Sequence, residues 1–309
     1  MSSERVAAID CGTNTIRLLV ADIDPGTGAA TDVERRLEMV RLGQGVDRTG
    51  RFDPAALERT LATTRDFALR IAELGATRVR MVATSATRDA SNRDELITGV
   101  RGILGIEPEV ITGDEEASLS YAGATGGLPV DVRPPFLVVD IGGGSTEFVL
   151  GDGSVTAARS VDIGSVRLTE RHFADDPPTV AQVARAIADI DGALSEAAEV
   201  VDLDAARTVV AVAGTATTIG AIHAGLETYD AAIVHHTRVP AAHVSAISER
   251  LLAATHDERA AITVIHPGRV DVIAAGSLIL RRVVERSGEA EVVISEHDIL
   301  DGIARSLAQ

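Results

Sequence analysis

Short apolar runs that end in polar turns predict two β-hairpins in this chain. The first hairpin covers 6–20, where the turn DCGTNT separates two mostly apolar runs. The second covers 136–150, where the turn DIGGGSTE separates two apolar runs in the same way. A strand, a tight polar turn and a second strand are the pattern of a hairpin.

The two hairpins are spaced 130 positions apart, and another pair of patterns repeats with the same spacing. The apolar run Val79–Ala83 leads into the polar turn Thr84–Thr87, and the run Val209–Ala213 leads into Gly214–Thr217. Repetition at a fixed offset is typical of a duplicated unit. Because strands alternate with stretches rich in helix-forming residues, we expect two similar halves of the α/β class.

Glycine and proline interrupt the pattern at 126–135 (GGLPVDVRPP), just before the second hairpin. This interruption predicts an N-terminal domain at 1–130 and a C-terminal domain at 131–309. Helices are expected at 115–124, 271–284 and 298–307. Asp114 is a suitable N-cap for the first of them, and the last is a candidate to pack back on the first domain.

Composition indicates a folded protein and excludes several functions. The 309 residues are 45% hydrophobic and carry a net charge of −17, and all 29 basic side chains are arginine. No lysine nucleophile, Schiff base or Walker lysine can exist here. Aromatic residues make up 2% of the chain and tryptophan is absent. Without stacking platforms or a basic balance, nucleic acid is not an expected partner.

Cys11 is the single cysteine, so no intramolecular disulfide forms, and we expect it to pack inward as a small hydrophobic residue. The N-terminus lacks the basic and long apolar segments of a signal peptide. No apolar run approaches the roughly 20 residues that span a bilayer. These features predict a cytoplasmic protein with no membrane partner.

Both hairpin turns have the character of anion sites. A turn with few Cβ atoms gathers backbone N–H groups that suit phosphate oxygens. The candidate phosphate-binding residues are Gly12, Thr13, Asn14, Thr15, Gly142, Gly143, Gly144 and Ser145. Asp10 and Asp140 begin the turns at equivalent places, and two such carboxylates would hold Mg²⁺. A single aspartate would be expected only to cap its own turn.

Arg88 follows the Ser/Thr turn of the first half, at the start of a predicted helix. Its guanidinium is placed to clamp a phosphate through two hydrogen bonds, and no lysine is available for that task. Arg93 is a weaker candidate, because an arginine at the surface is usually just solvated.

His235 and His236 invite a zinc hypothesis. Adjacent residues of an extended segment point to opposite sides, however, so we do not expect the two rings to form a metal site. His297-Asp298 is the dipeptide of certain metal-dependent phosphohydrolases, but the other ligands of such a site are missing.

Taken together, these segments resemble the exopolyphosphatase and guanosine pentaphosphate phosphohydrolase family of the actin-like ATPase superfamily. The turns at 10–15 and 140–147 look like its two phosphate motifs. Further similar segments are ATSATRDASN at 83–92, GDEEA at 113–117, VAGTATT at 212–218 and DVIAAGSLIL at 271–280. The resemblance covers nearly the whole chain and implies two ribonuclease-H-like domains that flank an interdomain cleft.

The resemblance also implies that Glu116 orients and deprotonates an attacking water. Spacing alone does not separate Glu116 from Glu115, because any acid in the first turn of a helix complements the helix dipole.

By the same resemblance, Asp140 and Asp10 hold Mg²⁺, with Mn²⁺ as the alternative ion and Glu147 supporting the site. Gly214 and Thr215 look like the nucleotide-side motif of the superfamily and are further phosphate-binding candidates.

The function implied is an exopolyphosphatase that removes terminal orthophosphate from inorganic polyphosphate. Three alternatives remain open: hydrolysis of the 5′ γ-phosphate of guanosine pentaphosphate, an ATP-dependent kinase, and a sensor that binds guanosine penta- or tetraphosphate without turnover. Similarity to the family also implies a homodimer.

Overall fold

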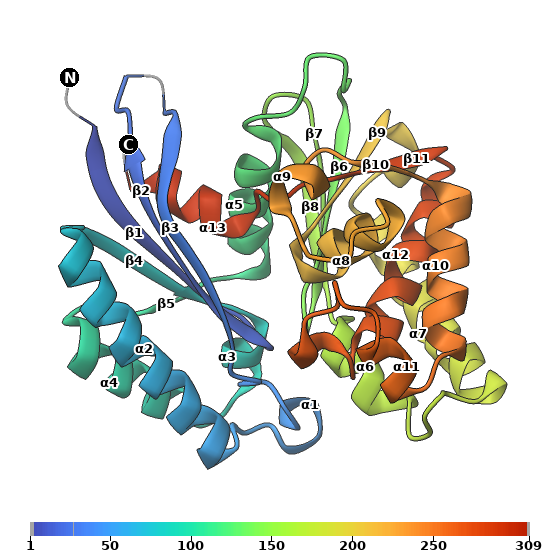
Figure 1. The fold of residues 1–309 in the computed structure, drawn as a ribbon, viewed down its shortest axis with the longest axis horizontal. Coiled ribbons are helices and arrows are strands. Elements are labelled where there is room, and N and C mark those ends of the chain that lie inside the picture. The colour runs from blue at the N-terminus through green and yellow to red at the C-terminus, as the bar shows by residue number, and fades with distance from the viewer. Residues whose placement is uncertain (1–2, 27, 308–309) are drawn as a thin grey trace. The chain divides into compact units, whose positions relative to one another are not determined.

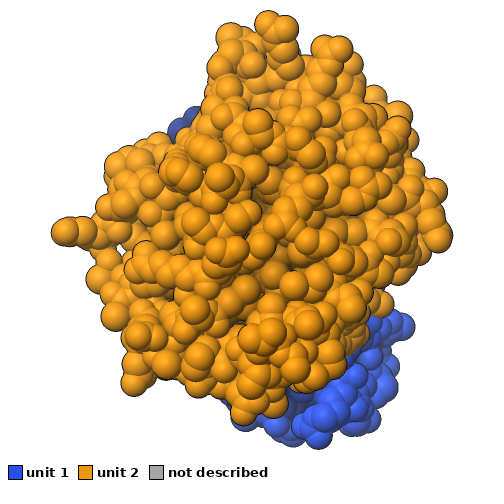
Figure 2. Space-filling model, turned by 90° about the vertical axis from the view of Figure 1, so that its right-hand side faces the viewer, with its two compact units in different colours: residues 1–123, 299–309 blue, residues 124–298 orange. Residues whose placement is uncertain are grey.

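The computed structural model describes residues 3–26 and 28–307, and they divide into two compact units. Unit 1 joins the described residues up to Gly123 to those from Ile299 onward, and unit 2 is Ala124–Asp298 (Figure 2). Each unit contains one sheet with helices packed on it (Figure 1). No helix in the described ranges combines the length and apolar character needed to cross a membrane.

Unit 1 is built on a five-stranded sheet in the order β3-β2-β1-β4-β5, in which β1, β4 and β5 are parallel and the other pairs antiparallel. Its strands are β1 (Glu4–Cys11), β2 (Thr15–Ile23), β3 (Ala30–Met39), β4 (Arg78–Ala83) and β5 (Glu109–Val110). Its helices are α1 (Val46–Thr49), α2 (Pro54–Leu74), α3 (Ser85–Asp89), α4 (Arg93–Leu104), α5 (Gly113–Thr125), which ends at the unit boundary, and α13 (Ile299–Ser306).

The apolar run in β1 is buried on both faces of the sheet, which is why it shows no alternation of polar residues. Ile9 packs in one cluster with Phe67 of α2 and Leu96 of α4. Ala8, on the opposite face, packs with Leu300 of α13.

Helix α13 is tied to unit 1 by polar contacts as well. The two Nη atoms of Arg35 donate to the two carboxylate oxygens of buried Asp301 at 3.2 and 2.6 Å. Arg305 donates to the carbonyl oxygen of Ala122 at 2.8 Å. A Cβ at Gly302 would lie 2.0 Å from the carbonyl oxygen of Leu119, so glycine permits the close approach of α13 to α5.

Unit 2 has a six-stranded sheet in the order β10-β11-β9-β6-β7-β8. The stretch β8-β7-β6-β9-β11 repeats the order and the strand directions of β3-β2-β1-β4-β5. Its strands are β6 (Phe136–Ile141), β7 (Thr146–Gly151), β8 (Val155–Val161), β9 (Thr208–Val212), β10 (Arg238–Pro240) and β11 (Glu291–Ile294). Its helices are α6 (Ser165–His172), α7 (Val180–Ala198), α8 (Ala213–His223), α9 (Ala231–Val234), α10 (Ala241–Ala253), α11 (His256–Ala260) and α12 (Ile273–Ser287), with 3₁₀ turns at Leu203–Ala205 and Pro267–Arg269.

The two predicted hairpins are confirmed as β1–β2 and β6–β7, and the α/β class is confirmed. One predicted detail is wrong, because α5 begins at Gly113 and Asp114 therefore lies inside its first turn. The hydroxyl of Thr112 takes the capping position and accepts a hydrogen bond from the Glu115 N–H at 3.2 Å.

Candidate functional site

In unit 2, the turn Gly142–Ser145 has its carbonyl groups occupied, and only the first of its N–H groups is used, in a bond to the Ser145 oxygen at 3.0 Å. The carbonyl oxygens of Gly142 and Gly143 accept hydrogen bonds from the first N–H groups of α6 at 2.9–3.0 Å. The Gly144 oxygen accepts from Nε of Arg167 at 2.6 Å. Within the described chain, the N–H groups of the last three turn residues donate to nothing. Three successive free N–H groups form the kind of nest that binds phosphate oxygens.

Gly164 allows α6 to approach this turn, since a Cβ there would lie 2.4 Å from the Gly143 oxygen. We expect Gly164→Ala to displace the turn, to lower the free energy of unfolding by about 1–3 kcal/mol and to weaken phosphate binding. Gly192→Ala in α7 is the matched control, because no atom lies within 4 Å of its Cβ position and alanine favours a helix by roughly 0.5–1 kcal/mol. Thermal unfolding and phosphate titration check both variants, and equal melting temperatures would contradict the expectation.

The equivalent turn of unit 1, Gly12–Thr15, also has carbonyl groups that accept hydrogen bonds and N–H groups that are left over. The carbonyl oxygens of Thr13 and Asn14 accept hydrogen bonds from main-chain N–H groups of 40–43 at 2.8–3.1 Å. The Thr13 and Ser85 hydroxyl oxygens lie 2.9 Å apart, which joins this turn to α3. The N–H groups of Thr13 and Asn14 have no acceptor among the described residues. The Gly12–Thr15 turn therefore also presents N–H groups to a ligand.

Two buried carboxylates face each other beside the unit 2 turn. Asp140 in β6 and Glu147 in β7 are directly opposite across the antiparallel pair, so their side chains lie on the same face of the sheet. Asp140 is 6% exposed and Glu147 is 1% exposed. The hydroxyl of Ser160 in β8 donates to Oε1 of Glu147 at 2.7 Å and helps to fix it. Buried carboxylates in proteins are paired or coordinate a metal, and two of them on one face of a sheet can share one cation.

Unit 1 places a cation of its own at the corresponding position. Asp10 in β1 is opposite Arg17 in β2, and its Oδ2 accepts from Nη2 and Nε of Arg17 at 2.6 and 3.0 Å. Arg17 and Glu147 are 130 positions apart, the offset of the repeat. The aspartate at the repeated position is therefore opposite an arginine in unit 1 and opposite a glutamate in unit 2.

The donor set of unit 2 suits a hard divalent ion. Mg²⁺ is commonly held by one or two carboxylates and keeps several waters or phosphate oxygens. No group of three or more His, Cys, Asp or Glu side chains surrounds a common metal position in the described part of the chain. Asp140 and Glu147 therefore fit Mg²⁺ or Mn²⁺, with water and substrate oxygens as the remaining ligands.

The two adjacent glutamates of α5 occupy different environments. The Glu115 side chain is 45% exposed and accepts from Nη2 of Arg80 at 2.8 Å. The Glu116 side chain is 10% exposed, and its Oε2 accepts from Nη1 of Arg88 at 2.6 Å. Arg88 is itself held by the Ile111 carbonyl oxygen at 3.1 Å. Burial beside the predicted phosphate arginine sets the environment of Glu116 apart from that of Glu115, and the role of Glu116 as the base stays a prediction.

Arg88 keeps part of its guanidinium for a ligand. Its Nε and Nη2 atoms donate to none of the described residues. Arg88 and Arg93 both line a pocket of about 660 Å³ in unit 1. Arg93 is exposed and forms no ion pair within the described chain.

Gly214 and Thr215 open α8, whose first N–H groups have no side-chain cap. Ala213 adopts a positive φ of 64°, so the chain turns sharply from β9 into this helix. A Cβ at Gly214 would lie 2.4 Å from Cζ of Arg269, so that guanidinium rests directly on the glycine. The Thr215 hydroxyl faces Gly276 of α12, which leaves its N–H as the part able to meet a ligand. Sequence reasoning missed Arg269, since nothing in the 3₁₀ turn Pro267–Arg269 indicates contact with position 214.

The extended segment expected at His235 and His236 is not observed, because both residues lie in a turn. Their ring centroids lie 3.6 Å apart, because His236 has a φ of 66° and the segment is not extended there. His297 stacks on His235 at 4.5 Å.

Cys11 is buried as expected, and burial, with the nearby Asp10 charge, raises the pKa of its thiol far above the usual range.

Comparison with known proteins gives the family. The model of the Ppx/GppA phosphatase family matches residues 19–309. The chain belongs to the Ppx/GppA phosphatase family. The chain is 49% identical, over the full length of both proteins, to Exopolyphosphatase 2 of Mycobacterium tuberculosis. It is also 31% identical to a bifunctional 3-dehydroquinate synthase/phosphatase of Fusobacterium nucleatum. That match covers 96% of this chain and 45% of the other protein.

Solved structures of Ppx/GppA proteins show the same fold. An exopolyphosphatase-like protein superposes with a TM-score of 0.95 at 44% identity, covering 99% of this chain and 98% of the other. The Ppx/GppA family member of Aquifex aeolicus superposes with a TM-score of 0.81 at 30% identity, covering 98% and 97%. The predicted actin-like ATPase fold is thereby confirmed. The roles of the individual Ppx/GppA site residues stay predictions.

Proposed function

We propose that this protein is an exopolyphosphatase that releases orthophosphate from the end of inorganic polyphosphate. The observation that carries the proposal is the pair of turns whose carbonyls are occupied and in which two or three successive N–H groups donate to no described residue. Full-length similarity to a protein named Exopolyphosphatase 2 supports the same substrate class. Gly12–Thr15 and Gly142–Ser145 would bind phosphate oxygens, and the first N–H groups of α8, at Gly214 and Thr215, would bind another phosphate.

In this reaction Glu116 acts as the general base. Its carboxylate takes a proton from a water whose oxygen forms a bond to the terminal phosphorus. The bridging P–O bond breaks, and the shortened chain leaves with the bonding electrons. Arg88 holds the Glu116 carboxylate through Nη1 and presents its remaining donors to the phosphate. Positioning and charge stabilisation supply most of the rate in such phosphoryl transfers.

Asp140 and Glu147 would hold the divalent ion, which we propose to be Mg²⁺ or Mn²⁺. When bound, the ion offsets the charge of the phosphate oxygens. Asp10 is a lesser candidate, because Arg17 already occupies its Oδ2. A homodimer and a cytoplasmic location stay predictions of the family resemblance and of the sequence.

The test is phosphate release from short polyphosphate, long polyphosphate and guanosine pentaphosphate, measured side by side with Mg²⁺ and with EDTA. We expect metal-dependent release from polyphosphate with the highest kcat/KM. Preference for guanosine pentaphosphate would replace the proposed substrate while keeping the chemistry. Binding of guanosine tetraphosphate without release from any substrate would overturn the enzymatic role.

A further inference from the structure

A second group of arginines lies at the other end of the unit 2 sheet. Strands β6, β9 and β11 are parallel, and their carboxyl ends lead toward the Gly142–Ser145 turn and α8. A pocket of about 330 Å³ opens instead at their amino ends, where Arg133, Arg207 and Arg238 line it. β6 has six residues, which separates the two ends by roughly 17 Å at about 3.3 Å per residue. The pocket is therefore separate from the candidate active site.

Two of these arginines have no charged partner among the described residues. The side chains of Arg133 and Arg207 make no hydrogen bond or ion pair with any residue that the structure describes. Most arginines of this acidic chain are paired with a carboxylate, as Arg238 is with Asp131 and Glu291 at 2.5 and 3.0 Å. With both acids engaged by Arg238, the pocket keeps the charges of Arg133 and Arg207 for a ligand.

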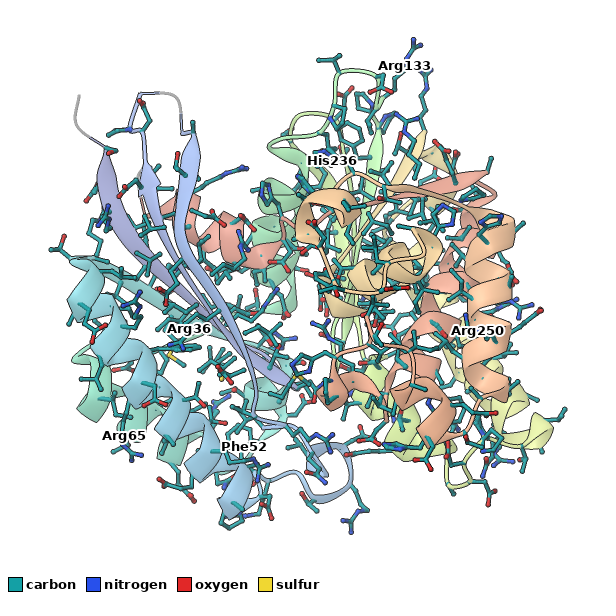
Figure 3. All side chains as sticks on the ribbon, in the orientation of Figure 1. Arg36, Phe52, Arg65, Arg133, His236 and Arg250 are labelled. Carbon is teal, nitrogen blue, oxygen red and sulfur yellow. The ribbon has the colours of Figure 1, made fainter. Side chains whose placement is uncertain are left out.

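Two hydrogen bonds hold the chain segments of Arg133 and Arg207 side by side. The hydroxyl of Thr208 donates to the Arg133 carbonyl oxygen at 2.9 Å, and the Arg207 N–H donates to the Pro135 oxygen at 2.9 Å. These bonds continue the β6–β9 pairing beyond Phe136. Figure 3 places Arg133 at the end of unit 2 away from α6, whose N-terminus contacts the glycine turn.

We infer that Arg133 and Arg207, in the pocket that Arg238 also lines, form a second anion site, which binds a phosphate group. Guanidinium groups bind phosphate through paired, charge-assisted hydrogen bonds. A pocket of this volume accepts orthophosphate or the end of a phosphate chain, and both offer the same oxygens. The inference does not depend on the proposed hydrolysis, because it concerns binding at residues that the catalytic proposal does not use.

The test compares Arg133→Gln/Arg207→Gln with Arg185→Gln/Arg250→Gln. The control removes two arginines that are likewise exposed and unpaired among the described residues of unit 2, outside the pocket (Arg250 is labelled in Figure 3). Tripolyphosphate and orthophosphate are titrated calorimetrically without divalent ions. We expect the wild type and the control to show a binding phase that the pocket variant weakens at least about tenfold. Circular dichroism melting verifies that both variants fold.

Comparing the two probes shows whether the site takes free phosphate or a phosphate chain. Comparing binding with activity shows which of the two proposals has failed. A free-phosphate site binds both probes equally, whereas a chain site binds tripolyphosphate more tightly and raises the KM for long polyphosphate in the pocket variant. If the wild type, the pocket variant and the control variant titrate identically, Arg133 and Arg207 are only solvated surface arginines, and the inference is overturned. An enzyme that releases no phosphate but shows the pocket-dependent phase overturns the proposed function and leaves the second site standing.

Discussion

Glu116→Gln is expected to lower kcat on polyphosphate by about 10²–10⁴-fold, the range that a general base contributes. Glutamine keeps the volume and an oxygen that can accept the hydrogen bond from Arg88. The variant therefore loses proton acceptance while the geometry is retained, and KM should change little. Initial phosphate release with Mg²⁺, analysed for kcat and KM separately, measures the effect.

The neighbouring residue supplies the control. Glu115→Gln makes the same chemical change one position away, on an exposed side chain that contacts Arg80. Arg80 also binds Glu109 at 2.7 Å, so it stays anchored in this variant. We expect kcat to remain near that of the wild type. A Glu115→Gln defect larger than that of Glu116→Gln would show that the base had been assigned to the wrong glutamate.

The difference between these two glutamates shows where sequence reasoning stops. The pattern of acids predicted the helix, because propensity and capping are local. It did not show which side of α5 is buried, since that depends on β4, β5 and α3, which come from elsewhere in the chain. Only the packed structure places Arg80 beside one carboxylate and Arg88 beside the other.

The hairpin turns were predictable, whereas their partners were not. Glycine and aspartate at the end of an apolar run specify a tight turn within a few residues. The contact of Arg269 with Gly214 joins positions 55 residues apart and follows no period. The strand β3 was missed because most of its side chains are exposed, as on an edge strand, and its sequence ATDVERRLEM is charged. The pairing of His235 with His236 depends on one positive φ.

Arg17 is the residue for which a signal existed in the sequence. It is separated from Glu147 by the repeat offset of 130, so aligning the two halves sets an arginine against a glutamate. Cross-strand register then turns that difference into a charge pair in one unit and an acidic pair in the other. This difference in charge at matched positions of two similar units would let the two turns serve different purposes.

This difference predicts that the two equivalent aspartates respond differently to Mg²⁺. We assume a divalent ion at a concentration roughly 100-fold above its Kd. Binding should then raise the melting temperature of the wild type by about 5–10 °C. We expect Asp140→Asn and Glu147→Gln to lose most of this rise, together with most of the phosphate release. Differential scanning fluorimetry in EDTA and in Mg²⁺, paired with activity, provides the measurement.

Asp10→Asn tests the same idea from the other unit. It removes the carboxylate that holds Arg17, whose side chain is 15% exposed, so it should lower stability in EDTA by about 1–3 kcal/mol. Because that cost concerns an internal ion pair, the stabilisation by Mg²⁺ should persist. If Asp10→Asn abolished the Mg²⁺ response while Glu147→Gln retained it, the metal would belong to unit 1, and the acidic pair of unit 2 would need another explanation.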